Sequence, residues 1–209
     1  MKTYLFDFDG TLVDSMPTFA SVMLKILDEY GIKYESDIVK VITPLGYAGT
    51  ARYFNTLGVD MPVDELVSKM ISYATAEYAE NIQAKPGVRE ALLELKARGC
   101  SLNVLTASPH SLLDVCLKRL RLYDLFDNVW SSDDFGMTKA DPEIYKEAAR
   151  RLGVAVSEVI FADDNPGALK TAKLGGMRVY GVYDASAEEY VEEMKGISDK
   201  YISEFSELI

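Results

Sequence analysis

Apolar positions change their spacing twice along the chain. Residues 4–8 (Tyr-Leu-Phe-Asp-Phe) form a short apolar run, which predicts a buried strand, and Asp9-Gly10-Thr11 follows as a turn signal. Apolar residues then recur three and four apart over residues 16–30, up to a stop at Gly31, and again over residues 63–78. Shorter helical segments between Ser36 and Leu57, broken at residues 43–46, complete a block that reads as all-helical.

The pattern alternates after a boundary at Lys85-Pro86-Gly87. Strands are predicted at residues 101–106, 128–131, 159–162 and 178–183, and helices at 88–97 and 166–174. Two further helices are predicted to open at Ser108-Pro109 and at Asp141-Pro142, with the first residue of each pair as the N-cap and the proline at the first helical position. Residues 184–209 are predicted to be helical. Alternation of this kind indicates an α/β fold with a doubly wound (Rossmann-like) parallel sheet. We therefore expect a core of residues 1–14 and 84–209, with an all-helical cap inserted at residues 15–83.

Charge and composition narrow the partners and the compartment. The net charge is −11, from 33 acidic and 22 basic residues, and no cluster of five basic residues occurs. Nucleic acids and anionic membranes need a basic surface, so we expect neither as a partner, and no obligate protein partner is evident. The chain has two cysteines far apart in sequence, which indicates reduced thiols. Its amino end does not resemble a signal peptide, and no apolar run reaches the ~20 residues of a membrane span. We therefore expect a cytoplasmic protein.

Polar side chains stand where the predicted strands end. The first strand ends in Asp7 and Asp9, the second in Thr106, and the fourth in Asp163-Asp164. Ligands of open α/β sheets bind outside the carboxyl ends of the strands, so these residues should meet in one crevice. Lys139, just before the helix that follows the third strand, should join them.

Clustered carboxylates of this kind predict a Mg²⁺ site. Carboxylates ~4 Å apart repel by about 4 kcal/mol at an effective dielectric of ~20, and a divalent cation removes this repulsion. Mg²⁺ prefers oxygen ligands, so Asp7, Asp163 or Asp164 and a carbonyl near Asp9 are the candidate metal ligands. A carboxylate such as Asp7 can attack phosphorus and form an acyl phosphate.

The other polar residues suit a phosphoryl group. Asp9 is placed to protonate the leaving oxygen and then to deprotonate water, and Lys139 supplies positive charge for phosphoryl oxygens. Thr106 and a neighbouring N–H, that of Ala107, can hydrogen-bond the same oxygens, while Gly10 permits a tight turn beside them. These residues are the candidate phosphate contacts, together with Arg52 and the segment around residues 45–47 of the cap.

The order of these motifs resembles the haloacid-dehalogenase-like hydrolases. Asp7-Phe8-Asp9-Gly10-Thr11 is similar to the first motif of that family, residues 105–108 (Leu-Thr-Ala-Ser) to the second, Lys139 to the third and residues 161–165 (Phe-Ala-Asp-Asp-Asn) to the fourth. The resemblance covers nearly the whole chain, with the helical insert matching the family's small cap. One departure is Ala140, because the family usually has proline after the lysine of the third motif.

The resemblance implies a Mg²⁺-dependent phosphatase of the phosphoglycolate-phosphatase type. Asp7 would be the nucleophile, Asp9 the acid and base, Thr106 and Lys139 the phosphate clamps, and Asp163 with Asp164 the metal ligands. The substrate would be a small phosphorylated metabolite, hydrolysed through a phospho-aspartyl intermediate.

Other functions make different demands on the sequence. A phosphosugar mutase of the same family, the main alternative, carries a cap histidine where this chain has Phe19, and the family's dehalogenases lack the acid at Asp9. A signalling receiver domain places its acid pair before the phospho-accepting aspartate, which is the reverse of this order. A non-catalytic phospho-ligand binding module remains a further alternative, although every catalytic position is filled. The sole histidine, His110, is expected to be a surface residue, with a substrate contact as the alternative.

Overall fold

The computed structural model describes residues 2–35 and 37–209 and divides the chain into two compact units. One unit, here the core unit, comprises Met1–Asp14 and Gln83–Ile209, and the other, the cap unit, comprises Ser15–Ile82. The sequence placed the corresponding boundaries after residues 14 and 83. The chain thus leaves the core unit shortly after its first strand and returns once.

Six parallel strands form the sheet of the core unit, in the order β3-β2-β1-β4-β5-β6. The strands are β1 Thr3–Phe6, β2 Ser101–Thr106, β3 Asn128–Ser131, β4 Val159–Asp163, β5 Arg178–Val182 and β6 Lys200–Ile202. The predicted α/β class with a parallel, doubly wound sheet is confirmed. The first strand lies between β2 and β4, so residues that follow β1 have the ends of both neighbours beside them.

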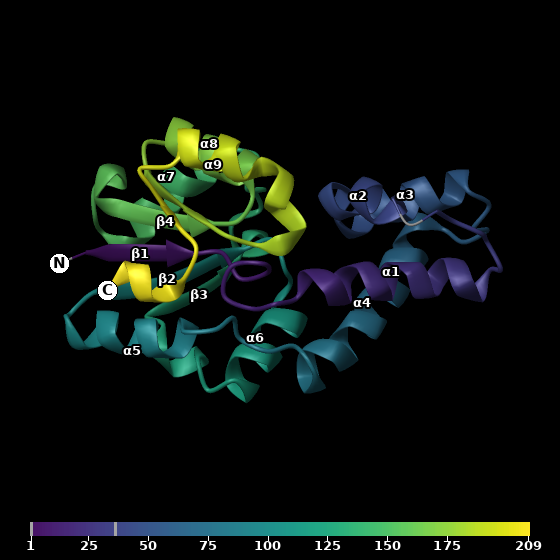
Figure 1. Ribbon diagram of the computed structural model, residues 1–209, viewed down its shortest axis with the longest axis horizontal. Helices are drawn as coiled ribbons and strands as arrows, with labels where there is room; N and C mark the ends of the chain where they lie inside the picture. The colour runs from purple at the N-terminus through teal and green to yellow at the C-terminus, as the bar shows by residue number, and fades with distance from the viewer. Residues whose placement is uncertain (1, 36) are drawn as a thin grey trace. The chain divides into compact units, whose positions relative to one another are not determined.

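Helices cover both faces of this sheet. Helices α7, α8 and α9 lie on one face, and α5 and α6 on the other (Figure 1). They are α5 Val88–Ala97, α6 His110–Arg119, α7 Pro142–Leu152, α8 Pro166–Leu174 and α9 Val191–Ile197. Strands covered on both sides are mostly apolar, and all four residues of β1, including Thr3, are buried.

The starts of the helices follow their capping residues. The Asp141 side chain accepts a hydrogen bond from the Glu143 N–H at 3.0 Å, and Pro142 occupies the first turn of α7, as the sequence predicted. Asn165 caps α8 by accepting from the N–H groups of Gly167 and Ala168, at 2.8 and 3.2 Å. The two caps fix where the loops after β3 and β4 become helices.

Two sequence predictions in the core unit are wrong. Helix α6 begins at His110 with Pro109 at the N-cap position, so Ser108 is not the cap, because its hydroxyl is bonded elsewhere. The segment 184–209 is not uniformly helical, since it contains the edge strand β6 as well as α9. A three-residue strand is too short for its alternation of side chains to be read from sequence.

The cap unit is helical. Its helices are α1 Met16–Glu29, α2 Ile38–Ile42, α3 Gly46–Thr56 and α4 Val63–Glu80. The two long helices, α1 and α4, confirm the helices predicted from the apolar spacing. Each buries one face, which includes Met23 in α1 and Met70 in α4. Ser36, where the shorter predicted segments begin, lies outside the described residues. Within the described chain, no helix combines the length and the apolarity that crossing a membrane requires.

Candidate active site

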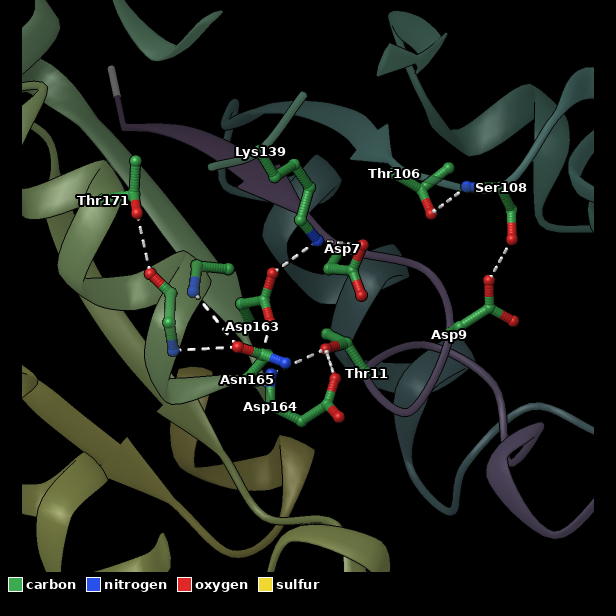
Figure 2. Close-up of polar contacts among 12 residues, drawn as sticks. Asp7, Asp9, Thr11, Thr106, Ser108, Lys139, Asp163, Asp164, Asn165 and Thr171 are labelled. Carbon is green, nitrogen blue, oxygen red and sulfur yellow. Dashed lines mark hydrogen bonds and ion pairs between the residues drawn. The ribbon is translucent and has the colours of Figure 1, made fainter. Parts of the chain in front are cut away.

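Three carboxylates meet where β1 and β4 end. Strand β1 stops at Phe6, so Asp7 is the first residue beyond it, while Asp163 is the last residue of β4 and Asp164 the next. Oxygen atoms of the three side chains lie within 4.8 Å of one another, and all three residues are buried (Figure 2). Because β1 and β4 are neighbours in the sheet, the fold itself brings together two motifs far apart in sequence.

Lys139 reaches this cluster from the loop before α7. Its Nζ lies 2.6 Å from Oδ1 of Asp7 and 2.7 Å from Oδ2 of Asp163, and its side chain is only 14% exposed. Burial alone would lower the pKa of Lys139, but the charges of Asp163 and Asp7 outweigh it and raise that pKa well above the ordinary value. The ammonium is therefore a fixed positive charge beside two carboxylates.

A single ammonium does not balance three carboxylates. Burial, followed by the charge of Asp7, raises the pKa of Asp163 to about 6 against the opposing effect of Lys139. Burial and the charges of Asp163 and Asp7 likewise raise the pKa of Asp164 well above its ordinary value. The site thus carries an excess of negative charge in an interior that disfavours it.

The turn after the first strand packs directly on Asp164. Gly10 has a φ of +73°, and a Cβ there would lie 2.8 Å from Cγ of Asp164, so only glycine fits. The Thr11 hydroxyl donates to Oδ1 of Asp164 at 2.7 Å and accepts from the Asp164 N–H at 3.1 Å. The sequence motif included Thr11, but its hydrogen bonds with Asp164 were not predicted.

Asp9 turns away from the three carboxylates toward the end of β2. The Ser108 hydroxyl donates to Oδ2 of Asp9, and the Ser108 N–H donates to Oγ1 of Thr106 at 3.1 Å (Figure 2). The carboxylate of Asp9 is not part of the cluster of side chains that could hold a metal, and the predicted metal ligand near Asp9, a main-chain carbonyl, stays a prediction. Ser108 was missed as a site residue because Ser-Pro reads as a helix cap.

The donor set fits a hard divalent cation. Asp7, Asp163 and Asp164 offer only carboxylate oxygens, the ligands that Mg²⁺ prefers. Among the described residues, Lys139 is the one ammonium bonded to this cluster, through Asp7 and Asp163. Three carboxylates therefore face one positive charge, and a divalent cation would supply the two that are missing. These three aspartates are therefore the residues that could hold Mg²⁺.

A comparison with protein families decides the identity of this arrangement. The sequence profile described as haloacid dehalogenase-like hydrolase matches residues 4–182, which include every motif at the strand ends. The chain belongs to the haloacid dehalogenase-like hydrolase family. Its curated relatives in that family are phosphatases that act on phosphorylated small molecules.

Individual relatives of the family are similar along most of their length. A phosphorylated carbohydrates phosphatase from Thermotoga maritima is 28% identical over 184 residues, covering 87% of this chain and 85% of that protein. The pyrophosphatase PpaX of Bacillus velezensis is 31% identical over 180 residues, covering 85% and 81%. The solved structure of CbbY from Rhodobacter sphaeroides in complex with phosphate matches with a TM-score of 0.84 at 22% identity, covering 100% and 96%; it shows the same fold.

This family member departs from the usual pattern at Ala140, where a proline commonly follows the lysine. Lys139 and Ala140 lie in a turn in which the Asp141 N–H donates to the Thr138 carbonyl at 2.9 Å. The buried Tyr145 hydroxyl contacts the Lys139 carbonyl oxygen at 3.0 Å. A side-chain hydrogen bond thus restrains the main chain of the lysine, a role the sequence did not reveal.

Removing that hydroxyl tests its role. We expect Tyr145→Phe to lower kcat severalfold and the free energy of unfolding by about 1 kcal/mol, because a buried carbonyl loses its donor. The matched control is Tyr201→Phe, since the buried Tyr201 hydroxyl has no hydrogen-bond partner among the described residues. Steady-state kinetics measure kcat, and urea unfolding measures the free energy of unfolding. Equal values of these two quantities for Tyr145→Phe and Tyr201→Phe would contradict the expectation.

Three other residues were candidates for contact with substrate, and each is described within its own unit. Ala107 is exposed in the loop after β2, beside Thr106. Arg52 is exposed on α3 in the cap unit, and its contact with substrate stays a prediction. His110 is held between Asp114, 2.8 Å from Nδ1, and Asp134, 2.8 Å from Nε2, with its side chain 40% exposed, which is a surface ion-pair arrangement.

His110 should make stability depend on pH. Hydrogen bonds to Asp114 and Asp134 raise its pKa above the ordinary value, so the folded state gains stability from protonated His110 below about pH 6.5. That gain is lost as pH rises through the folded-state pKa, so the stability difference between wild type and His110→Asn should shrink between pH 6 and 8.5. Because the chain has one histidine, its NMR titration is unambiguous; a pKa at or below about 6.5 would contradict this.

Proposed function

We propose that this protein is a cytoplasmic, Mg²⁺-dependent phosphatase that hydrolyses a small-molecule phosphate monoester through a phospho-aspartyl intermediate on Asp7. The observation that carries the proposal is the Asp7 carboxylate, buried at the end of β1 and bonded to the Lys139 ammonium at 2.6 Å, beside Asp163 and Asp164. Membership of a family whose curated relatives are phosphatases supports it.

Mg²⁺ would be held by Asp7, Asp163 and Asp164. When bound, it supplies positive charge that lets an ionised carboxylate approach an anionic phosphoryl group. Lys139 contributes a second positive charge at the same place, held by contacts of 2.6 and 2.7 Å to Asp7 and Asp163. Thr106 and the N–H of Ala107, at the end of β2, would donate hydrogen bonds to phosphoryl oxygens.

The first step transfers the phosphoryl group to the protein. A carboxylate oxygen of Asp7 forms a bond to phosphorus while the bond from phosphorus to the leaving oxygen breaks. Asp9 gives its proton to that oxygen, so the alcohol leaves neutral. The hydrogen bond from Ser108 to Oδ2 of Asp9 holds the acid in place at the end of β2.

The second step releases phosphate. Asp9, now ionised, takes a proton from a water molecule whose oxygen bonds to phosphorus. The bond between phosphorus and the Asp7 oxygen breaks, which frees inorganic phosphate and restores both carboxyl groups to their starting states. Asp9 thus serves as acid and then as base, and no other proton carrier is required.

A phosphosugar mutase is the competing function within the family. Phe19, at the position of the mutase histidine, contacts the ring of Tyr47 edge to face in the cap unit, with centroids 5.4 Å apart. A phenyl ring has no titratable group and cannot exchange protons with a sugar hydroxyl. The presence of Phe19 at this position therefore favours hydrolysis over return of the phosphoryl group to the substrate.

Phosphate release from a panel of esters tests the proposal. The panel contains phosphoglycolate, hexose and hexitol phosphates, nucleoside monophosphates and pyrophosphate, each assayed with Mg²⁺ and with chelator. We expect release that requires Mg²⁺ and is fastest for one class of ester. Undiminished release in chelator would remove the metal from the mechanism, and interconversion of sugar phosphate isomers without release would favour the mutase.

A further inference from the structure

Lys85 forms a nearly buried ion pair in the core unit outside the acid cluster. Its Nζ lies 2.7 Å from Oδ2 of Asp184, and the two side chains are 13% and 5% exposed. The same ammonium donates to the carbonyl oxygen of Tyr183 at 2.6 Å and to that of Gly10. The residue thus joins the end of the β5 segment to the turn after β1.

Asp184 holds this ammonium in place. Its Oδ1 accepts from the N–H and the hydroxyl of Ser186, at 2.9 and 2.6 Å, while Oδ2 faces Lys85. Burial would raise the pKa of Asp184, but the bonds from Lys85 and Ser186 outweigh it and keep that pKa below the ordinary value. A charged, fixed carboxylate therefore leaves the Lys85 ammonium little freedom.

The carbonyl that Lys85 contacts belongs to the peptide between Gly10 and Thr11. The Gly10 end of this peptide packs on the Asp164 carboxylate, where a Cβ would meet Cγ at 2.8 Å. At its other end, the Thr11 hydroxyl donates to Oδ1 of Asp164 at 2.7 Å. One peptide is therefore in contact with the Lys85 ammonium and also orients a carboxylate of the acid cluster.

Stability alone does not account for such a pair. Burying an ammonium and a carboxylate costs several kcal/mol each in desolvation, and apolar residues of similar volume are often as stabilising. Fixing the direction of a particular carbonyl, in contrast, needs a strong donor held at a defined point.

We propose that Lys85, anchored by Asp184, is a positioning residue for the metal site: it fixes the Gly10–Thr11 peptide and, through Thr11, the direction of the Asp164 carboxylate. The inference rests on the proposed Mg²⁺-dependent function. It assigns Lys85 no contact with substrate.

The sign of the effect separates positioning from simple electrostatics. Removing the Lys85 charge makes the surroundings of the cluster more negative, so Coulomb attraction alone would tighten Mg²⁺ binding. Loss of a residue that orients a metal ligand instead weakens binding, typically 10- to 100-fold. Opposite outcomes are therefore expected from the two explanations.

The experiment is a calorimetric Mg²⁺ titration of the full chain without substrate, repeated as the Mg²⁺ dependence of phosphate release. We expect Lys85→Met to weaken Mg²⁺ binding about tenfold or more. The double variant Lys85→Met/Asp184→Leu leaves no unpaired buried charge and restores the net charge, and we expect the same weakening. Lys85→Arg, which keeps a cation and its donors, should remain within about threefold of wild type.

A matched control is Lys96→Met. Lys96 also pairs with an aspartate of the core unit, Asp127 at 2.5 Å, next to the amino-terminal start of β2, and its loss should leave Mg²⁺ binding unchanged. Thermal unfolding reports whether each variant folds, and the charge-neutral double variant provides the test if the single one does not.

The outcomes distinguish this inference from the proposed function. Mg²⁺ binding by folded Lys85 variants that is as tight as wild type, or tighter, overturns the role of Lys85 even when the wild type hydrolyses esters. If the Lys85 variants bind Mg²⁺ more weakly but the wild type releases phosphate from no ester, the positioning role is supported and the proposed phosphatase activity is contradicted. A wild type that binds no Mg²⁺ overturns both.

Discussion

Replacing Asp7 by asparagine is expected to abolish turnover, lowering kcat by a factor of the order of 10⁴ or more while the protein stays folded. An amide oxygen cannot form the acyl phosphate, and no neighbouring group replaces it, because Asp163 and Asp164 come from the other strand end. The fold should tolerate the change, since asparagine has the same shape and Lys139 keeps Asp163 at 2.7 Å. Phosphate release and far-UV circular dichroism measure the two effects.

The control for this variant is Asp124→Asn, an isosteric change of an exposed aspartate in the core unit. It should retain the activity of the wild type. Turnover by Asp7→Asn at a tenth of the wild-type rate or above would show that the nucleophile lies elsewhere.

Lys139→Met is expected to damage both activity and stability. The ammonium is the partner of Asp7 and Asp163, with contacts of 2.6 and 2.7 Å, and its removal leaves buried carboxylates without a counter-charge. Breaking a buried pair in this way costs about 3–5 kcal/mol in the free energy of unfolding. Loss of a charge that stabilises the transferring phosphoryl group should lower kcat by about 10²–10³-fold.

The destabilisation by Lys139→Met should depend on pH. Burial already raises the pKa of Asp163 to about 6 with the lysine present, and without it the carboxyl binds a proton more readily. An acid with a raised folded-state pKa contributes stability at low pH that is lost as pH rises, so the variant should be weakest near pH 8 and recover toward pH 5.

Urea unfolding of wild type and Lys139→Met at pH 5.5 and pH 8 measures this effect. Mg²⁺ should stabilise the variant more than the wild type, because the cation replaces the missing charge. The exposed ion pair of Lys170 with Glu193 offers the control, as Lys170→Met should shift stability little at either pH. Equal stability and turnover of wild type and Lys139→Met would contradict the assigned role.

The sequence predicted the parts of the site that depend on strand ends. Asp7, Thr106 and Asp163 each follow or end an apolar run, and parallel strands bring such ends to one edge of the sheet. Lys139 was predicted from its place before a helix, and the structure brings it to the carboxylates. The capping signal Asp141-Pro142 was also sufficient to predict where α7 begins, because a cap involves only neighbouring residues of the chain.

What the sequence left open depends on tertiary contacts. Ser108 follows the rule for helix caps, yet its hydroxyl donates to Asp9, which lies 99 positions away. Lys85 reads as part of a boundary, and its ammonium contacts Gly10 and Asp184 only because the fold brings them together. The partners of Ser108 and Lys85 are distant in sequence, so local propensity cannot predict them.

The short strand β6 was missed for a related reason. Lys200–Ile202 pairs with β5 at the edge of the sheet, and three residues carry too little periodicity to outweigh the helical pattern around them. Pairing with a preformed neighbour, and not intrinsic preference, determines such an element.

The central claim is tested most directly by trapping the covalent intermediate. Wild type mixed with a ³²P-labelled substrate ester and quenched in acid should carry label in the tryptic peptide of residues 3–25, which contains Asp7, and Asp7→Asn should carry none. The account predicts label that is formed and lost at rates consistent with turnover. Rapid hydrolysis with no labelled protein, or with label in a peptide that lacks Asp7, would contradict it.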